Sequence, residues 1–482
     1  MSLAGIAGVL GALLCAQSEA ARTGPDAVGK PWGRTPGMHQ FRGNPSHTWY
    51  GQGPVPDHPV VLWRFPRTER MCSQSAVGTQ DKRWCGTGWT GQPVLRELAD
   101  GRHEVIVGTF DKRVIFLDGG TGVRTRPDFK AHDLVKGTVS LDPDGYPLLY
   151  FGSRDNKLRV VALDRPRPTE LWALDSNDYP GLHNNDWDAN PSVVDDLLIE
   201  GGENSYLFTV MLHRSLDAGG LAQVQPEVKL VYPGWTPELL AELGDHNVSI
   251  ENSPAVFGDR IYFANSGGRI VGLNLAAARE GRAQVEFDFW IGDDVDASIV
   301  VDAQGMLYVA AELERKIARP RQVGQLAKLD PSRPQDPLVW RLFVPALAGD
   351  PRGGGIWSTP ALHRDVLYVT TQSGKLLVVD RDTGHVQWWQ TLSSHLWSSP
   401  VVVDDTLLVA TCQDGKIHAY DVSEPRTPKP RWVVKVGWGG CIESTPLVYK
   451  GRIYVGTWDG FVYALGERTV ARRPAASKKN KR

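Results

Sequence analysis

The sequence predicts an all-β protein, an eight-bladed β-propeller of four-stranded antiparallel blades, from three observations. A sequence unit recurs about every 50 residues, which is typical of propeller blades. The 482 residues include 51 Gly, 33 Pro and 17 Trp, a composition rich in turns and aromatic side chains. The two ends of the repeat array also supply complementary parts of one blade, which predicts a closed ring.

The repeat is clearest where a Ser/Thr-Pro pair opens an alternating apolar run. Clear copies start at Asn252, Ser358, Ser398 and Ser444, and looser copies start near residues 91, 137, 189 and 297. The repeat proline or its equivalent then falls once in each of eight units, at Pro93, Val139, Pro191, Pro254, Ile299, Pro360, Pro400 and Pro446.

Each unit has the pattern of four short strands. A β-rich run such as Arg452–Thr457 is followed by an Asp-Gly or Ser-Gly turn, which supplies the positive φ of a tight hairpin. A third run follows, as in Lys375–Asp380 or Lys416–Asp421. The fourth strand carries a bulky aromatic residue, as at Trp172, Trp290, Trp340, Trp388 and Trp432.

The chain ends predict how the ring closes. The eighth unit stops after its third strand near Leu465, and the missing tryptophan strand is found at the other end, as Val60–Phe65. We therefore expect the N-terminal strand to complete the last blade and to remove an open sheet edge. The predicted propeller spans 37–466, and 467–482 form a basic, disordered tail.

The N-terminus has the pattern of an export signal. Leu3–Leu14 is apolar but only 12 residues long, too short to span a bilayer and suited to a signal-peptide core. We expect a signal peptide at 1–20, a linker at 21–36 and a periplasmic or secreted protein. A lipid anchor at Cys15 and a retained apolar N-terminus are the alternatives. No later run has 18 consecutive apolar residues, so we expect no transmembrane segment.

The cysteine count and the net charge indicate which bonds and partners to expect. Cleavage would leave four cysteines, and an even number in an exported chain predicts disulfides, which we expect at Cys72–Cys85 and Cys412–Cys441. The 53 basic and 55 acidic residues give a net charge of -2, so no global field favours nucleic acid. A propeller is self-sufficient, and we expect a monomer.

Candidate ligand residues lie three positions before each repeat proline, where the inner strands enter the channel. The position holds Thr90 in the first unit and then Lys136, Asp188, Glu251, Asp296, Trp357, Trp397 and Glu443. Asp188, Glu251 and Asp296 are hard oxygen ligands that could hold Ca²⁺, and the tryptophans could stack on a planar or sugar ligand. A solvated channel mouth and a misregistered repeat are the alternatives.

Other features have weaker chemical meaning. His183 and His246 each lie five residues before a ring acid, a spacing that repeat ancestry also explains. Two excursions interrupt the repeat, at Ala218–Asn247, with a short helix expected at Thr236–Leu243, and at Glu312–Pro337. Long loops are often functional, but their composition assigns no chemistry here.

The repeat, the opening Gln40-Phe-Arg-Gly-Asn-Pro45 and the strand Leu62-Trp63-Arg64 resemble exported proteins with pyrroloquinoline-quinone-like propeller repeats. This superfamily includes quinoprotein alcohol dehydrogenases and the BamB-type outer-membrane assembly lipoproteins. The resemblance covers residues 37 to 466. It implies that the Thr-Gly turns at Thr121-Gly122 and Thr383-Gly384 have a structural role.

The resemblance, together with the ring of candidate residues, implies two functions. The first is a non-catalytic exported propeller that binds a partner protein, glycan or envelope component through the mouth of its channel, without a resident cofactor. The alternative is a dehydrogenase that uses pyrroloquinoline quinone and Ca²⁺ to oxidise an alcohol or polyol, with Asp296 as the general base. Against the alternative, no two cysteines are adjacent, whereas the resemblance implies an adjacent disulfide over the quinone.

Overall fold

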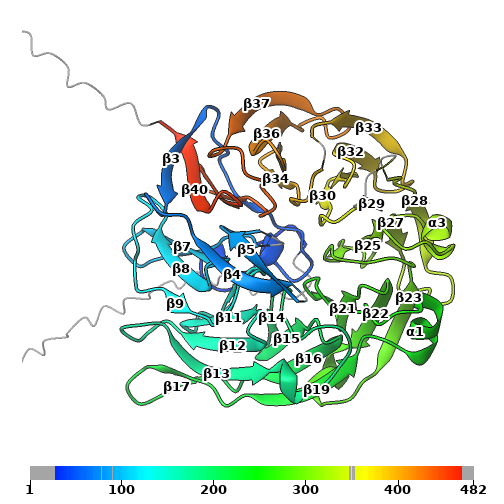
Figure 1. Ribbon diagram of the computed structural model, residues 1–482, viewed down its shortest axis with the longest axis horizontal. Helices are drawn as coiled ribbons and strands as arrows, with labels where there is room; N and C mark the ends of the chain where they lie inside the picture. Colours follow the sequence, from blue (N-terminus) through cyan, green and yellow to red (C-terminus); the bar gives the residue numbers. More distant parts are fainter. Residues whose placement is uncertain are drawn as a thin grey trace, which may run out of the picture.

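A computed structural model of the chain describes residues 28–468 except 78, 89–90, 347–348, 350–352 and 394. The predicted signal peptide at 1–20, part of the predicted linker and nearly all of the predicted tail lie outside these residues. The predicted architecture is confirmed, because eight antiparallel sheets of four blade strands surround a central axis (Figure 1). No helix within the described residues has the length and apolar character needed to cross a membrane.

Blades 1 to 4 follow one another along the chain, each with its innermost strand first. Their strands are β6 (Val94–Glu97), β7 (His103–Thr109), β8 (Arg113–Asp118) and β9 (Phe129–Lys130); β10 (Ser140–Leu141), β11 (Leu148–Ser153), β12 (Lys157–Ala162) and β13 (Thr169–Asp175); β14 (Ser192–Val194), β15 (Leu197–Gly201), β16 (Tyr206–Met211) and β19 (Glu227–Pro233); and β20 (Ala255–Phe257), β21 (Arg260–Ala264), β22 (Arg269–Asn274) and β23 (Val285–Trp290).

Blades 5 to 8 repeat this order, except that an early strand completes the last one. Their strands are β24 (Val300–Val301), β25 (Leu307–Ala310), β27 (Leu326–Leu329) and β28 (Leu338–Leu342); β30 (Ala361–His363), β31 (Val366–Thr370), β32 (Lys375–Asp380) and β33 (Val386–Thr391); β34 (Val401–Val403), β35 (Thr406–Ala410), β36 (Lys416–Asp421) and β37 (Lys429–Lys435); and β38 (Leu447–Tyr449), β39 (Arg452–Thr457), β40 (Phe461–Glu467) and β3 (Pro59–Phe65).

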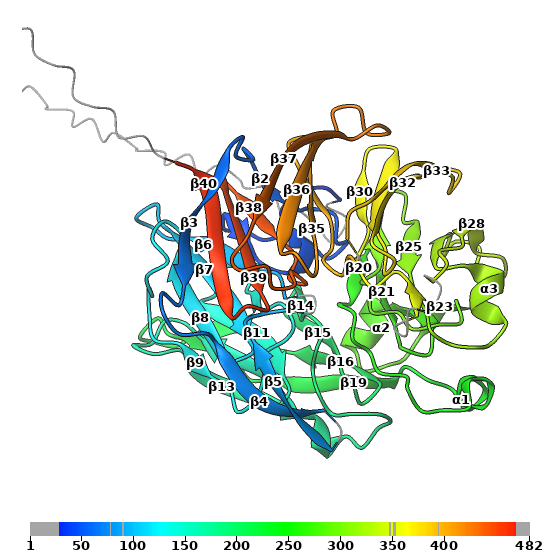
Figure 2. The ribbon, with the colours of Figure 1, turned by 45° about the horizontal axis from the view of Figure 1, so that its top comes forward.

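The excursions add short elements outside the blades. They are the hairpins β4 (Cys72–Val77) with β5 (Gln80–Cys85) and β17 (Ser215–Leu216) with β18 (Ala222–Gln223), the pair β26 (Glu312–Leu313) with β29 (Gly354–Gly355), the helices α1 (Pro237–Leu243), α2 (Leu275–Arg279) and α3 (Arg319–Val323), and the turns η1 (Phe41–Gly43) and η2 (Ser176–Asp178). Helices α1 and α3 lie at the rim of the ring (Figure 2). The helix expected at Thr236–Leu243 is confirmed, with Thr236 as its N-cap.

The ring is closed as the sequence predicts. Strand β3 pairs antiparallel with β40, and Trp63 lies opposite Ala464. The indole Nε1 of Trp63 donates to Gly119 O of blade 1 at 3.0 Å. A Cβ at Gly122 would lie 2.7 Å from the Trp63 ring, so this turn requires glycine because the tryptophan of the preceding blade covers it. Trp340 contacts Gly384 in the same way.

The hydrophobic core lies between the blades rather than on the axis. Each buried cluster joins the facing surfaces of neighbouring sheets, as where Ile106 and Phe116 of blade 1 meet Leu149 and Val161 of blade 2. Sheets that pack face to face exclude water in this way. The axial region is therefore left to polar groups, which have to find hydrogen-bond partners.

The N-terminal segment 37–52, which we call the plug, fills one end of the axial channel. Its strands β1 (Gly37–Met38) and β2 (Gly51–Gln52) lie inside blades 1 and 8, antiparallel to β6 and parallel to β38. Between them the plug bonds the other blades in turn, through Leu141 N, Asn190 Oδ1, Val256 N, Val301 N, Leu362 O, Pro360 O and Pro400 O.

Arg42 lies at the centre of the plug and is completely buried. Its guanidinium donates to Pro360 O and Pro400 O, both at 2.6 Å, and lies 4.3 Å from the centre of the Tyr50 ring. The plug contacts the inner strands at and after the repeat prolines in the sequence. The residues that precede the prolines therefore line the opposite end of the channel. That end is the mouth of the channel.

Candidate functional site at the channel mouth

The described members of the predicted ring converge on the mouth from seven blades. Lys136 forms an ion pair with Asp188 and lies 3.8 Å from Glu203 Oε1. On the opposite side, a cleft is lined by residues of blades 5 to 8, which are Asp296, Trp357, Thr359, Trp397, Ser399, Glu443 and Thr445. Thr90, the first ring position, lies outside the described residues.

The acidic side of the mouth contains more carboxyl groups than the ring alone supplies. Glu200, Glu203 and Glu312 join it, together with Asp186 and Asp294 from the polar segments that precede ring acids. Glu200 is completely buried, and neither of its carboxyl oxygens has a hydrogen-bond partner. These groups make the site far more acidic than the ring alone predicts.

The carboxyl oxygens form two close groups. In one, Asp294, Asp296 and Glu312 each place an oxygen within 4.8 Å of the others, and in the second His183, Glu203 and Glu251 do so. The three residues expected to share one Ca²⁺ are therefore divided, because Asp188 faces Lys136 while Glu251 and Asp296 belong to separate groups. His246 belongs to neither group.

Burial and mutual repulsion shift the pKa values at the mouth upwards. Burial, reinforced by the charge of Glu251, raises the pKa of Asp294 to about 8. Burial and Asp188 raise the pKa of Asp186 to about 6. Burial also raises the pKa of Asp296 and Glu312 well above the usual range, with repulsion from Asp294 and Asp296 respectively. Desolvation and like charges disfavour the ionised carboxylate.

Positive charge at the mouth is limited. Burial lowers the pKa of Lys136, but the charges of Asp188 and Glu203 outweigh it, so the ammonium stays protonated. The Arg154 side chain bonds Asp186 at 2.5 Å, and Arg315 bonds Asp245 at 2.6 Å. The group of Asp294, Asp296 and Glu312 makes no ion pair with any described lysine or arginine.

The aromatic side of the mouth is already stacked. The rings of Trp357 and Trp397 lie 4.9 Å apart and 13° from parallel, and His395 stacks on Trp397 at 5.0 Å. Trp458, which the ring pattern does not include, lies 5.9 Å from Trp397 and donates to Glu443 Oε2 at 3.1 Å. The tryptophans thus stack on one another rather than enclosing an open slot.

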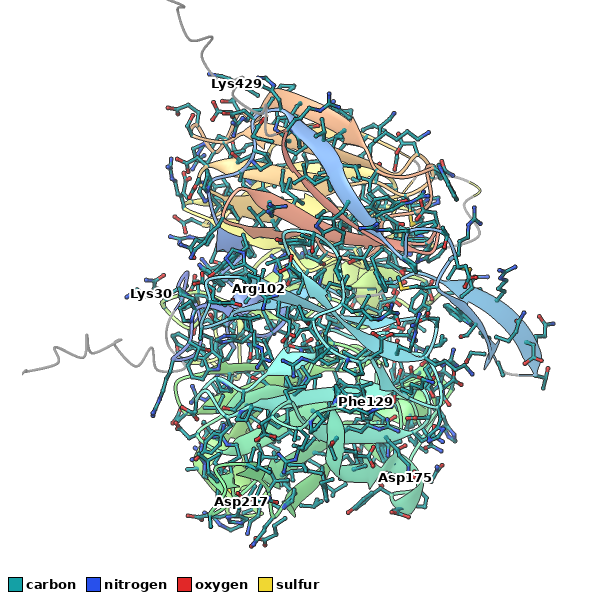
Figure 3. The ribbon with its side chains drawn as sticks, turned by 90° about the vertical axis from the view of Figure 1, so that its left-hand side faces the viewer. Lys30, Arg102, Phe129, Asp175, Asp217 and Lys429 are labelled. Carbon is teal, nitrogen blue, oxygen red and sulfur yellow. A yellow bond between two sulfur atoms is a disulfide. The ribbon has the colours of Figure 1, made fainter. Side chains whose placement is uncertain are left out.

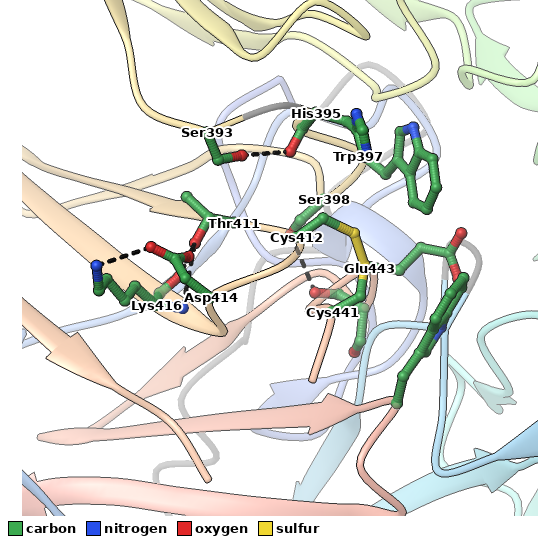
Figure 4. Close-up of a disulfide and its surroundings, with 12 residues drawn as sticks. Ser393, His395, Trp397, Ser398, Thr411, Cys412, Asp414, Lys416, Cys441 and Glu443 are labelled. Carbon is green, nitrogen blue, oxygen red and sulfur yellow. Dashed lines mark hydrogen bonds and ion pairs between the residues drawn. A yellow bond between two sulfur atoms is a disulfide. The ribbon is translucent and has the colours of Figure 1, made fainter. Parts of the chain in front are cut away.

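Both predicted disulfides are present, Cys72–Cys85 and Cys412–Cys441. The second joins the turn after β35 to the segment that leads into blade 8. It places Glu443 beside Trp397 at the mouth (Figure 4). The cleft between these side chains and Asp296 holds about 20 Å³, which is room for a single water or ion.

Comparisons with known proteins agree with this architecture. Residues 322–469 match the family model described as outer membrane protein assembly factor BamB. No curated protein matches the sequence. The solved structures that resemble the chain include BamB from Moraxella catarrhalis, with a TM-score of 0.54, 17% identity, and 82% of this chain and 100% of that chain covered.

Two enzymes are among the similar structures. A europium-containing methanol dehydrogenase has a TM-score of 0.59 at 12% identity, covering 89% of this chain and 98% of that one. The quinohemoprotein alcohol dehydrogenase from Comamonas testosteroni has a TM-score of 0.57 at 14% identity, covering 92% and 82%. At such identities the likeness concerns the fold.

Proposed function

Because the chain is a β-propeller of the PQQ-like, BamB-like class, we propose that it is an exported, non-catalytic binding protein that engages a partner protein at the mouth of its channel. The observation that carries the proposal is the shape of the mouth. Seven blades direct charged and aromatic side chains to one place, yet the cleft among them holds about 20 Å³. Such a surface can recognise a partner that lies across it.

The dehydrogenase alternative requires a flat, multi-ring quinone, which does not fit this mouth. The cleft is too small for it, and Trp357 already stacks on Trp397. The cysteines nearest the mouth, Cys412 and Cys441, are 29 residues apart, so they cannot form the adjacent disulfide of the quinoproteins. These features favour binding over oxidation.

A divalent cation does fit the acidic side. Two oxygens that each lie about 2.4 Å from one Ca²⁺ are at most about 4.8 Å apart, and Asp294, Asp296 and Glu312 meet this limit. We include Ca²⁺ in the proposal as a counter-charge for these carboxylates. Its role is to hold the mouth in shape for the partner.

Site-specific crosslinking tests the partner. A photoreactive phenylalanine in place of Trp357 should give one discrete protein adduct in the producing cell, and Glu443→Gln should weaken it. The matched control replaces Trp389, which is 57% exposed on the outer strand of blade 6, and should give none. Crosslinking only at position 389, or a glycan adduct at 357, contradicts the protein partner. Quinone-dependent oxidation of any alcohol in a dye-coupled assay would show an enzyme.

Thermal melting tests the cation. Ca²⁺ at a hundredfold excess over its Kd should stabilise the folded protein by about 2.7 kcal/mol, and chelator should reverse the gain. Asp294→Asn with Asp296→Asn should abolish the gain, whereas Asp178→Asn with Asp336→Asn, which alters exposed carboxyls, should keep it. An unchanged melting temperature in the unmutated protein removes Ca²⁺ from the proposal.

A further inference from the structure

A second surface on the mouth side has the opposite charge. Hairpin β4–β5 belongs to no blade, because it forms a sheet of its own between β3 and β6 along the chain. It extends beyond the blades on the right of the view in Figure 3. Its base is held by the Cys72–Cys85 disulfide and by hydrogen bonds from Met71 N to Gly460 O and from Ser73 Oγ to Phe110 O.

Four cations surround the base of this hairpin without a carboxylate partner. Arg64, Arg70, Lys82 and Arg83 make no ion pair with any described acid, although exposed Glu69 and Asp81 lie on the same segment. Elsewhere in the fold, arginines form close ion pairs with carboxylates, as Arg214 does with Asp142, Asp144 and Asp196. Unpaired arginines next to one another repel, so a surface that gathers them is suited to a negative partner.

Aromatic rings hold three of these four cations in place. The guanidinium carbons of Arg64 and Arg70 lie 5.1 and 5.0 Å from the centre of the Trp438 ring, which is 58% exposed. Lys82 Nζ lies 4.2 Å from the centre of Trp84. Stacking of this kind immobilises a cation while leaving its N–H groups free to bond outwards.

A pocket lies among these groups. It measures about 250 Å³ and is lined by Arg70, Lys82, Arg83, Trp84, Cys85, Phe110 and Trp458. Its walls therefore combine three cations at the rim with three aromatic rings. Tryptophan, arginine and buried aromatic pockets are the features that dominate protein–protein interfaces.

We propose that this surface, the cationic hairpin patch, binds an acidic segment of a partner polypeptide and takes one of its large apolar side chains into the pocket. Complementary charge identifies the occupant, since Arg70, Lys82 and Arg83 form no ion pair with any acid that the structure describes. A long polyanion is disfavoured because the patch adjoins Glu443, which Trp458 contacts at 3.1 Å. The inference deepens the proposed function by naming the chemistry of the partner.

Fluorescence anisotropy with defined probes tests it. A short labelled peptide of glutamates around one tryptophan should bind the full chain at low salt and weaken at high salt, because screening acts on exposed charges. Two further peptides, with lysine for every glutamate or with glycine for the tryptophan, should bind at least about tenfold more weakly. Equal binding of the lysine peptide overturns the charge assignment, and equal binding of the glycine peptide overturns the pocket assignment.

Matched variants locate the binding site. Lys82→Gln with Arg83→Gln removes two exposed charges of the hairpin and should weaken the acidic peptide by about tenfold or more. Arg167→Gln with Lys429→Gln removes two exposed charges elsewhere and should leave the affinity unchanged. Equal affinity in both variants, equal loss in both, or no binding to the unmutated protein overturns the proposal. The proposal is also overturned if the protein binds anionic vesicles or single-stranded DNA more tightly than it binds the peptide.

The mouth variant separates this inference from the proposed function. Glu443→Gln should weaken the crosslink at position 357 and leave the acidic peptide bound at least as tightly, because it removes a negative charge beside the patch. Loss of the peptide site with an intact crosslink shows that only the inference on the patch is wrong. An absent crosslink with intact peptide binding shows that only the mouth assignment is wrong.

Discussion

The two ends of the axial channel are built from the same eight inner strands, but they differ in the bonding partners of their polar side chains. At the plug end, Arg42, His39 and His47 are all buried and bond backbone carbonyls. At the mouth, Glu200, Asp296 and Glu312 are buried and Asp294 is half-buried, and none of the four forms an ion pair with a described lysine or arginine, although the charge of Arg315 acts on Asp294. Side chains that bond fixed backbone carbonyls rigidify a fold, whereas carboxyl groups gathered without ion pairs are characteristic of a site that binds something.

The largest effect should follow from removing the plug. Replacing 37–52 with a Gly/Ser chain of equal length keeps β3 but exposes the inner strands of every blade. Buried Met38, Phe41 and Tyr50 would each lose roughly 1.5–3 kcal/mol of hydrophobic stabilisation, so we expect an insoluble protein or a loss of more than about 5 kcal/mol. Chemical denaturation measures the difference. The same exchange of exposed residues 217–221 is the control, and equal stability of both proteins would refute a structural role for the plug.

The two central cations should respond differently to substitution. Arg42→Met leaves the carbonyls of Pro360 and Pro400 without their donor and should cost about 3–5 kcal/mol, whatever the pH or Ca²⁺ concentration. Lys136→Met leaves Asp188 and Glu203 without their counter-charge, and a lower pH should recover part of the loss. Denaturation curves at two pH values compare them, and the same pH response in both variants would show that the two ends are not distinct.

A pair of glycines isolates the packing of the plug. Gly43 and Gly244 have φ values of +70° and +72°, but a Cβ at Gly43 would lie 2.3 Å from the Trp49 ring, whereas a Cβ at Gly244 meets nothing within 4 Å. Gly→Ala at either position costs about 1 kcal/mol of backbone strain. We expect Gly43→Ala to lose about 2 kcal/mol more than Gly244→Ala, as measured by thermal melting. Equal losses would show that the plug tolerates movement.

The two ends should also show pH responses of opposite sign. Burial lowers the pKa of His39 and His47 from 6.5 to about 4. The unfolded chain therefore binds protons first as the pH falls, and each histidine should cost roughly 2 kcal/mol of stability between pH 6.5 and 5. His47→Gln should flatten this acid limb of the stability profile. A profile that keeps its slope in this variant would assign the acid limb to other groups.

The raised pKa of Asp294 has the reverse consequence. The folded state holds its proton up to about pH 8, whereas the unfolded state releases it near 3.8, so stability falls as the pH rises between these values. Ca²⁺ should remove this loss, and Asp294→Asn should remove both the loss and the effect of Ca²⁺. Melting curves from pH 5 to 8, with and without the ion, measure it. A Ca²⁺ effect that shrinks with rising pH would contradict this model.

The blades could be predicted from the sequence because each blade repeats the same local chemistry. A short stretch of sequence is enough to recognise a turn residue with positive φ, the repeat proline or a tryptophan strand such as Val60–Phe65. The plug could not be predicted, since residues 37–52 occur once and include His39, Arg42 and Asn44, polar side chains that usually indicate exposed chain. His39 and Asn44 bond the carbonyls of Trp32 and Lys30, whereas Arg42 depends on the carbonyls of Pro360 and Pro400, which lie far along the chain.

The candidate site was only partly predictable for a related reason. Counting back three residues from the repeat proline locates ring residues such as Asp296 and Glu443. It cannot locate a residue that lies away from the start of an inner strand. Glu200 and Glu312 reach the mouth from neighbouring segments. The one local signal for Glu200 is a carboxylate within the apolar run Leu197–Gly201, where an unpaired charge is costly.

The closure of blade 8 also determines when the ring can form. The backbone N–H of His58, just before β3, bonds Glu467 of β40, and the two residues are 409 positions apart. At about 5–20 residues per second, a ribosome needs roughly 20–80 s to make the intervening chain. Strand β3 is thus made before the other blade strands, yet it can pair with β40 only after the last blade strand has been made. The plug, which bonds every blade, faces the same delay, so the N-terminal part of the propeller completes the architecture last.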